Sequence, residues 1–194
     1  MNIRITFTEP VLGTWPADPE VASKYIASKA PDAGTIADEI AATSVEEVTE
    51  KSMTIFPRGE AGPVLYDYQI KGFFKDACGM LARVKSYKSS KIKAYKKIID
   101  GLIFVEPRMI PLTLSGEMGN CQRPLRAQTA QGERVSLANS EEIPAGSAAE
   151  FTVTCLDPAH EELVREWLEY GRLRGIGQWR NSGKGRFAFE ELPD

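Results

Sequence analysis

Two amphipathic helical patterns, each lying between strand-like segments, constrain the fold of this chain more than any other feature. The first is an apolar stripe at helical spacing, formed by Ile70, Phe73, Phe74, Ala77, Leu81 and Val84. The second is predicted to begin at Pro158, to be capped by Asp157 and to end at Gly171. Its apolar side consists of Leu163, Val164, Trp167 and Leu168. Both patterns predict helices with one buried side.

Short alternating or apolar segments around these helices predict strands. The candidates are residues 3–7, 53–56, 64–66, 102–105 with an extension to 114, 134–137, 148–155 and 186–190. Residues 134–137 and 148–155 are expected to pair across a turn at residues 143–146. Without insertions the order is strand, helix, strand, strand, helix, strand. This order predicts an α+β fold with a ferredoxin-like (RRM-like) βαββαβ core.

An acidic segment interrupts this order after the first strand. Asp18 and Thr35 are each suited to cap a helix, and Pro19 suits the first position of the helix that Asp18 would cap. We therefore expect a helical, acidic insertion at residues 13–60. A chain of 194 residues, of which 42% are hydrophobic, suits one globular domain. The expected organisation is a single domain over residues 1–194.

Composition argues against several classes of protein. No apolar run approaches the roughly 20 residues that span a bilayer, and residues 1–7 alternate like a strand instead of forming a signal peptide's apolar block. A cytoplasmic protein with no membrane partner is therefore expected. Cys78, Cys121 and Cys155 stand singly, which indicates neither a paired-cysteine zinc site nor a disulfide framework. We predict no metal site and no cofactor.

The net charge of −3 conceals an uneven distribution along the chain. Residues 1–67 hold five basic and eleven acidic residues, residues 68–134 hold thirteen and five, and residues 135–194 hold six and eleven. The corresponding net charges are −6, +8 and −5, which together give −3. The strongly positive segment in the middle of the chain would attract a polyanion, so nucleic acid is the expected partner.

Two basic segments lie in this middle part. The first contains Arg83, Lys85, Lys88, Lys91, Lys93, Lys96 and Lys97, interleaved with Tyr87 and Tyr95. The lysines would neutralise phosphates and the tyrosines would stack on unpaired bases; a solvated helix face is the alternative. Helical spacing with Ile92, Ile98 and Ile99 favours a core position for Tyr95. The second segment, residues 121–132, holds Arg123 and Arg126 and suits either phosphate and base contacts or a polar loop.

A third segment, residues 171–189, combines five glycines and five basic residues with no carboxylate. Because glycine lacks a Cβ, such a segment can bring backbone amides and cations close to a phosphate. A loop that ends a helix and leads into a strand is an equally good explanation. The three segments would form one binding surface if folding gathers them on one face.

Three short motifs resemble those of the repeat-associated mysterious protein (RAMP) superfamily, in the family's order, over roughly residues 66–190. Residues 70–75 resemble its lysine-glycine entry to the first helix, and residues 143–151 its proline-alanine-glycine turn into a strand. Residues 175–187 resemble its C-terminal glycine-rich loop. The proline-glycine-serine that usually precedes the helix is replaced by residues 66–69, and the acidic insertion is a second departure. The whole chain also resembles proteins of bacterial prophages, which implies a free-standing relative.

The resemblance implies an RNA-binding module like the backbone subunits of CRISPR effector complexes, which polymerise along a guide RNA. By position, Lys71, Lys75 and the glycine-rich loop would face RNA. The expected partners are RNA or single-stranded DNA, with a homo-oligomer or filament along the strand. With the basic segments included, the candidate nucleic-acid-binding residues are Lys71, Lys75, Lys85, Lys88, Lys91, Arg123, Arg126, Arg174, Gly175, Gly177, Arg180, Gly183, Lys184, Gly185 and Arg186.

Two other functions compete with a non-catalytic nucleic-acid binder. One is a phage-encoded interaction protein that mimics an effector subunit and inhibits a host defence complex, indicated by Asp38, Glu39, Glu46, Glu47 and Glu50 in the insertion. The other is a metal-dependent nuclease. The resemblance implies a histidine or a loop aspartate for cleavage, and the chain offers His160 and Asp67. A surface histidine and a helix-capping aspartate are the alternatives, so we predict no catalytic residue.

Overall fold

The computed structural model describes residues 1–18, 53–129 and 132–193, and within these it leaves the side chains of residues 125–129 and 132–136 undescribed. The predicted helices that follow Asp18 and Thr35 lie outside the described residues, as does most of the acidic insertion. What is described is an α+β structure with helices and two sheets. No helix of the described residues is long and apolar enough to cross a membrane.

The larger sheet of the described chain has seven strands, and each observed pairing in it is antiparallel. Its order is β12 (Phe187–Leu192), β1 (Asn2–Phe7), β11 (Ala148–Cys155), β8 (Met109–Thr113), β6 (Gly62–Tyr66) and β5 (Arg58–Gly59), with β7 (Ile103–Glu106) also beside β11. β1 therefore has a neighbouring strand on each side, β12 and β11. Its alternating sequence buries Ile3, Ile5 and Phe7 completely, as its period of two predicts.

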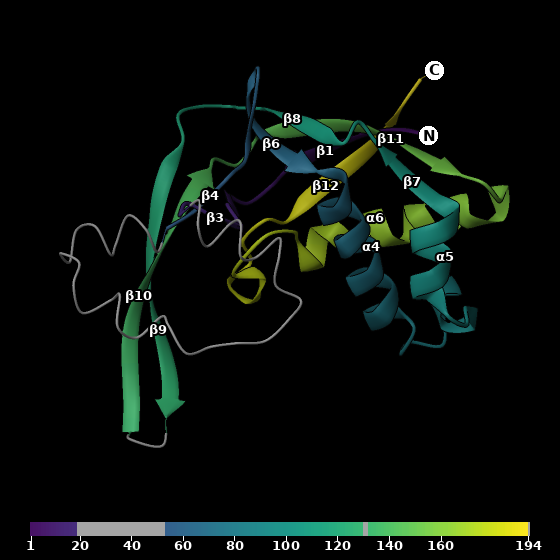
Figure 1. Cartoon of the computed structure of the whole chain (residues 1–194). Helices are drawn as coiled ribbons and strands as arrows, with labels where there is room; N and C mark the ends of the chain where they lie inside the picture. Colours follow the sequence, from purple (N-terminus) through teal and green to yellow (C-terminus); the bar gives the residue numbers. More distant parts are fainter. Residues whose placement is uncertain (19–52, 130–131, 194) are drawn as a thin grey trace.

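Three helices cover one side of this sheet (Figure 1). They are α4 (Asp67–Leu81), α5 (Tyr95–Leu102) and α6 (Glu161–Arg174), accompanied by the short 3-10 helices η1 (Lys88–Lys91), η2 (Pro158–His160) and η3 (Arg180–Ser182). The core between helices and sheet includes aromatic contacts: the centre of the Phe74 ring lies 5.5 Å from that of Trp167, and the centre of the Phe73 ring lies 5.2 Å from that of Phe187. Tyr95 packs against this core, which confirms its predicted position.

The start of α4 is fixed by side chains. The Tyr66 backbone N–H donates to Gln69 Oε1 at 2.7 Å, which satisfies a donor that the helix itself leaves unpaired. The Gln69 amide in turn donates to Thr14 Oγ1 at 2.8 Å. Asp67, proposed from the sequence as a cap, accepts from the Tyr68 N–H at 2.8 Å. These contacts anchor the first turn of α4 to the segment that follows β1.

The ends of both predicted helices differ from the prediction. α4 stops at Leu81, and Val84 is 45% exposed because the chain leaves the helix through successive turns. α6 continues past Gly171 to Arg174. Gly171 does not end the helix; a Cβ there would overlap the Phe187 ring, so glycine permits close packing of α6 on β12. The helix ends instead at Gly175, which has a φ of +71°.

The predicted pairing of residues 134–137 with residues 148–155 is wrong. β10 (Gly132–Ile143) pairs along eleven residue pairs with β9 (Gly119–Thr129), while β11 pairs with β1, β7 and β8. The long hairpin extends away from the larger sheet (Figure 1). Its base belongs to a second sheet with β2 (Val11–Leu12), β4 (Thr54–Ile55) and β3 (Trp15–Pro16). Residues 121–129, considered as a polar loop, are therefore a strand.

Candidate nucleic-acid interface

The glycine loop, defined as residues 175–186, closes on its own backbone. Gly175, Gly177, Gly183 and Gly185 all have positive φ angles. A Cβ on Gly175 would lie 2.6 Å from the Lys184 carbonyl oxygen, and one on Gly185 would overlap the Ile176 carbonyl. The N–H of Ile176 donates to the Gly185 carbonyl at 2.9 Å, and the N–H of Gly185 donates to the Pro10 carbonyl at 2.8 Å. These glycines allow two chain segments to cross at backbone contact, and these amides are already hydrogen-bonded within the protein.

Two arginines of this region share one carboxylate. Arg174 Nε donates to Asp76 Oδ2 at 2.8 Å and Arg180 Nη1 donates to the same oxygen at 2.7 Å. Burial raises the pKa of Asp76, but the hydrogen bonds and charges of the two guanidinium groups outweigh it, so the pKa lies below its ordinary value. The hydrogen bond that Arg174 donates to Asp76 raises the pKa of Arg174. Two cations held by one anion leave a net positive charge beside the glycine loop.

The other two cations of the glycine loop differ from each other. Lys184 Nζ lies 2.6 Å from Glu142 Oε2, and both side chains are largely buried. Lys184 therefore ties the loop to the end of β10. Arg186 is exposed and has no ion-pair partner in the described part of the chain. Of the two residues, Arg186 presents a charge that solvent and a ligand can reach.

Arg123 joins the second basic segment to the glycine loop. It lies on β9 and is only 5% exposed. Its guanidinium donates to Ser140 Oγ at 3.0 Å and to Gln178 Oε1 at 2.6 Å, and lies 5.5 Å from the centre of the Trp179 ring. Arg126 lies three residues along the same strand, opposite Val135, and its side chain is outside the described residues. Folding thus brings two of the three predicted segments together.

Lys71 and Lys75 lie on a different side of α4 from Asp76. Lys71 Nζ donates to the Asp100 carbonyl at 3.1 Å and sits 5.3 Å from the Phe104 ring centre. Lys75 pairs with the Asp100 carboxylate at 2.5 Å. Both lysines therefore contact the end of α5, and Lys71 also contacts the start of β7.

The basic loop, defined as residues 83–97, connects α4 to α5 and is held by one glutamate. Glu166 on α6 accepts from the N–H groups of Lys88 and Ser89 at 2.7 and 3.0 Å and from Ser89 Oγ at 2.5 Å. The indole N–H of Trp167 donates to the same hydroxyl at 2.9 Å. The Ser89 side chain is buried, so the loop has a fixed anchor.

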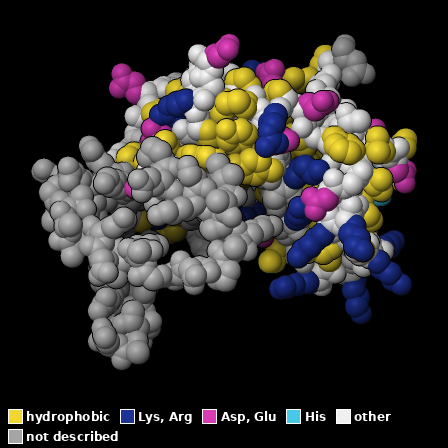
Figure 2. All heavy atoms as spheres, in the orientation of Figure 1, with side chains coloured by type: hydrophobic (Ala, Val, Ile, Leu, Met, Phe, Trp, Pro, Cys, Tyr) yellow, Lys and Arg dark blue, Asp and Glu magenta, His cyan; other side chains and the backbone are white. Residues whose placement is uncertain are grey.

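The seven cations of the basic loop are all exposed: Arg83, Lys85, Lys88, Lys91, Lys93, Lys96 and Lys97. Within the described residues only Lys88 has an ion-pair partner, Glu162. Figure 2 shows Lys and Arg side chains gathered at the lower right, where Figure 1 places the lower ends of α4 and α5. The basic loop is thus a surface of largely uncompensated positive charge.

The basic loop and the glycine loop lie at opposite ends of α6. The basic loop contacts Glu162 and Glu166 near the start of the helix, and the glycine loop follows Arg174 at its end. Arg174 lies twelve residues after Glu162, which corresponds to about 18 Å along the helix axis. The three predicted segments therefore form two cationic regions instead of one.

The fold is similar to that of a chain in a cryo-EM structure of the type III-B Cmr-beta bound to cognate target RNA. The TM-score is 0.53 with 9% sequence identity, over 99% of this chain and 58% of that chain. The present chain thus spans little more than half of that protein's length. At this identity the similarity shows a shared fold.

Two further solved structures match with lower scores. A chain of a type IV-B CRISPR complex has a TM-score of 0.46 and 10% identity, over 100% of this chain and 93% of that one. Cmr6 from Pyrococcus furiosus has a TM-score of 0.45 and 13% identity, over 100% of this chain and 97% of that one. No protein-family model and no curated protein sequence matches the chain.

The residues considered for cleavage lie at the starts of two different helices, His160 at α6 and Asp67 at α4. His160 ends η2, and Asp67 pairs with Arg108 at 3.3 Å at the start of α4. In the described part of the chain, no three His, Cys, Asp or Glu side chains lie close enough together to hold a metal ion. The acidic residues that indicate an interaction protein, Asp38 to Glu50, are outside the described residues.

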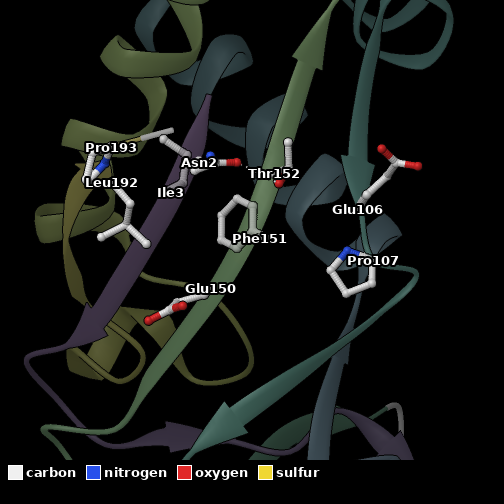
Figure 3. A pocket seen from close by; sticks show the side chains of 9 residues that line it. All are labelled: Asn2, Ile3, Glu106, Pro107, Glu150, Phe151, Thr152, Leu192 and Pro193. Atoms are coloured by element: carbon white, nitrogen blue, oxygen red, sulfur yellow. Dashed lines mark hydrogen bonds between the residues drawn. The ribbon is translucent and has the colours of Figure 1, made fainter.

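A cavity of about 280 Å³ lies across strands β12, β1, β11 and the end of β7 (Figure 3). Its lining includes the carboxylates of Glu106 and Glu150 and the polar side chains of Asn2 and Thr152. Glu150 pairs with Arg4 at 3.3 Å. Negative side chains at this cavity repel phosphates, so it is unsuited to a polyanion.

Proposed function

We propose that this protein is a non-catalytic binder of RNA or single-stranded DNA that holds its ligand mainly through phosphate contacts. The observation that carries the proposal is the basic loop, where seven exposed cations lie on one segment and only Lys88 is paired among the described residues. Uncompensated cations release counterions when they neutralise phosphates, and this release drives binding at low salt. The second region adds Arg186 and the positive charge around Asp76.

The proposal extends to the family. A ferredoxin-like βαββαβ core is part of this proposal. It is supported by the strand neighbours β12-β1-β11-β7, with α4 between β1 and β7 along the chain and α6 between β11 and β12. We infer that the chain is a free-standing, prophage-encoded relative of the RAMP superfamily. The fold similarity to a chain of a complex bound to target RNA supports the relation to the superfamily, while the prophage origin and the free-standing state rest on the sequence resemblance.

The proposal is tested by measuring the affinity for a labelled single strand at several salt concentrations. We expect the logarithm of the association constant to fall linearly with the logarithm of salt concentration. Replacing Lys85 and Lys91 by glutamine removes two exposed charges without breaking a described ion pair. On single strands, each lost phosphate contact makes this slope about 0.7 less steep. The slope of the double variant should therefore be about 1.4 less steep than that of the wild type. Its affinity near 0.1 M salt should fall by at least about tenfold.

The control removes the same net charge elsewhere. Arg4 lies on β1 and pairs with Glu150 on β11, and Arg108 lies between β7 and β8 and pairs with Asp67 at the start of α4. The Arg4→Gln, Arg108→Gln variant should keep the salt dependence of the wild type, and its affinity should stay within about threefold of the wild-type affinity. The reason is that charges farther than about 10 Å from the bound strand are screened at 0.1 M salt. Equal losses in both variants, or no binding by the wild type at low salt, would contradict the proposed function.

A further inference from the structure

Trp179 occupies an unusual position at the tip of the glycine loop. Its φ is +53°, in the left-handed region, and it is 43% exposed. A bulky residue in this conformation is strained and persists only where its surroundings fix it. Here the Trp179 carbonyl accepts from the N–H of Ser182 at 3.0 Å and from its hydroxyl at 2.8 Å. The backbone thus holds a large aromatic ring toward solvent.

One side of the Trp179 ring is supported by a buried cation. The Arg123 guanidinium lies 5.5 Å from the ring centre, and its two described hydrogen-bond acceptors, on Ser140 and Gln178, are both neutral. No carboxylate pairs with Arg123 among the described side chains. A buried cation without a counter-ion costs free energy, and a nearby anion would recover part of it. The surroundings of Trp179 therefore favour a negatively charged ligand.

A hollow beside the ring adds further positive charge. It has a volume of about 390 Å³, is open to solvent, and is lined by Arg174, Gly177, Gln178, Trp179, Arg180 and Asn181. Asp76 balances only one of the two arginine charges. A flat aromatic surface next to surplus cations in an open hollow matches the two parts of a nucleotide, since the base stacks and the phosphate pairs.

We propose that Trp179 stacks on one unpaired nucleobase of a bound strand and that the adjoining phosphate lies in the hollow beside Arg174 and Arg180. The proposal rests on the proposed function, because it assigns one site to a strand that the protein binds. Bases in a duplex are stacked on each other, so the ligand class is a single strand. Stacking on an aromatic ring tolerates any base, so this site requires a base without selecting its identity.

The test compares two variants of Trp179 on two ligands. Trp179→Gly removes the ring and relieves the positive-φ strain, so it should unfold at the same urea concentration as the wild type or a higher one. Trp179→Phe keeps an aromatic ring. The ligands are a labelled uridine or thymidine strand of about 16 nucleotides and an abasic sugar-phosphate strand of the same length.

We expect Trp179→Gly to bind the base-containing strand about tenfold more weakly and the abasic strand within about twofold of wild type. Trp179→Phe should retain most of the affinity. Tryptophan emission should be quenched by the base-containing strand in the wild type. This quenching should be clearly smaller in Trp179→Phe, because Trp167 is fully buried and Trp15 is only partly exposed.

Two results would overturn the inference while leaving the proposed function standing. In one, Trp179→Gly binds the base-containing strand as tightly as wild type; in the other, it loses affinity equally for both strands, which indicates a structural role. If the wild type binds neither strand at low salt, the proposed function fails and this site fails with it.

Discussion

Gly185 lies where the glycine loop crosses its own backbone, and its φ is +73°. A Cβ at this position would overlap the Ile176 carbonyl, which is part of the backbone and cannot rotate away. We therefore expect Gly185→Ala to lower the free energy of unfolding by at least about 3 kcal/mol, from positive-φ strain of about 1–2 kcal/mol and the displaced backbone. Urea denaturation followed by circular dichroism measures the change.

Gly183 supplies the matched control. Its φ is +92°, but the nearest atoms to a Cβ at this position would be those of the flexible Arg186 side chain, at 3.6 Å and beyond. Gly183→Ala should therefore cost only the strain, about 1–2 kcal/mol. Equal losses of unfolding free energy in the two variants would show that the close backbone contact is not the reason why position 185 needs a glycine.

Exposure and charge were the residue-scale features that sequence could predict. The basic loop is dense in lysine and lacks acidic residues, and its cations are all exposed. The partners of Arg174 and Arg180 could not be found in this way, because Asp76 is 98 and 104 residues away along the chain. Trp179 was missed for a related reason: its strained backbone and its contact with Arg123 arise only when β9 packs beside the glycine loop.

At the scale of elements, Asp76 links α4 to the end of α6 and to η3. Its pKa is below its ordinary value of 3.8, so its ionised form contributes stability. That contribution is fully present above the unfolded-state pKa and is lost as pH falls through the lower folded-state pKa. We expect Asp76→Asn to destabilise the protein by about 1–2 kcal/mol at pH 7, because three partly exposed side chains are screened by solvent. The difference from wild type should shrink as pH falls below about 4.

The measurement is urea unfolding of both proteins between pH 7 and pH 3. Asp100→Asn is the control, because Asp100 is more exposed than Asp76 and Lys75 is its one ion-pair partner among the described residues. Exposed pairs of this kind contribute less than about 1 kcal/mol. A stability difference for Asp76→Asn that stays constant down to pH 3 would contradict the assigned role of its charge.

Element order was more predictable than element pairing. β1, α4, α6 and β12 follow from periods of two and of 3.6 in their apolar residues. The hairpin of β9 and β10 was missed because β9 contains Pro124 and polar residues that are typical of a loop. Its eleven residue pairs are set by contact between the two strands, which single-strand composition does not encode.

At the scale of the whole molecule, the two cationic regions are separated by most of the length of α6. In the proposed function, the basic loop would contact phosphates at one end, and the glycine loop with Arg186 and Trp179 would supply a second set of contacts at the other. A strand bound at one region brings its own continuation to the other at high effective concentration. The two regions should therefore act together only on a strand long enough to reach both.

The separation predicts a threshold in strand length. The two regions are about 18 Å apart along α6. At a rise of about 3.4 Å for each stacked nucleotide, a strand needs at least about six nucleotides to reach both. Affinity measured on strands of about 2 to 16 nucleotides should rise steeply near six to eight and then level off. In the Lys85→Gln, Lys91→Gln variant the steep rise should be much smaller, because one region has lost its charge while short strands still bind the other. A steady increase with length in the wild type, or an unchanged threshold in the variant, would mean that the two regions do not share one strand.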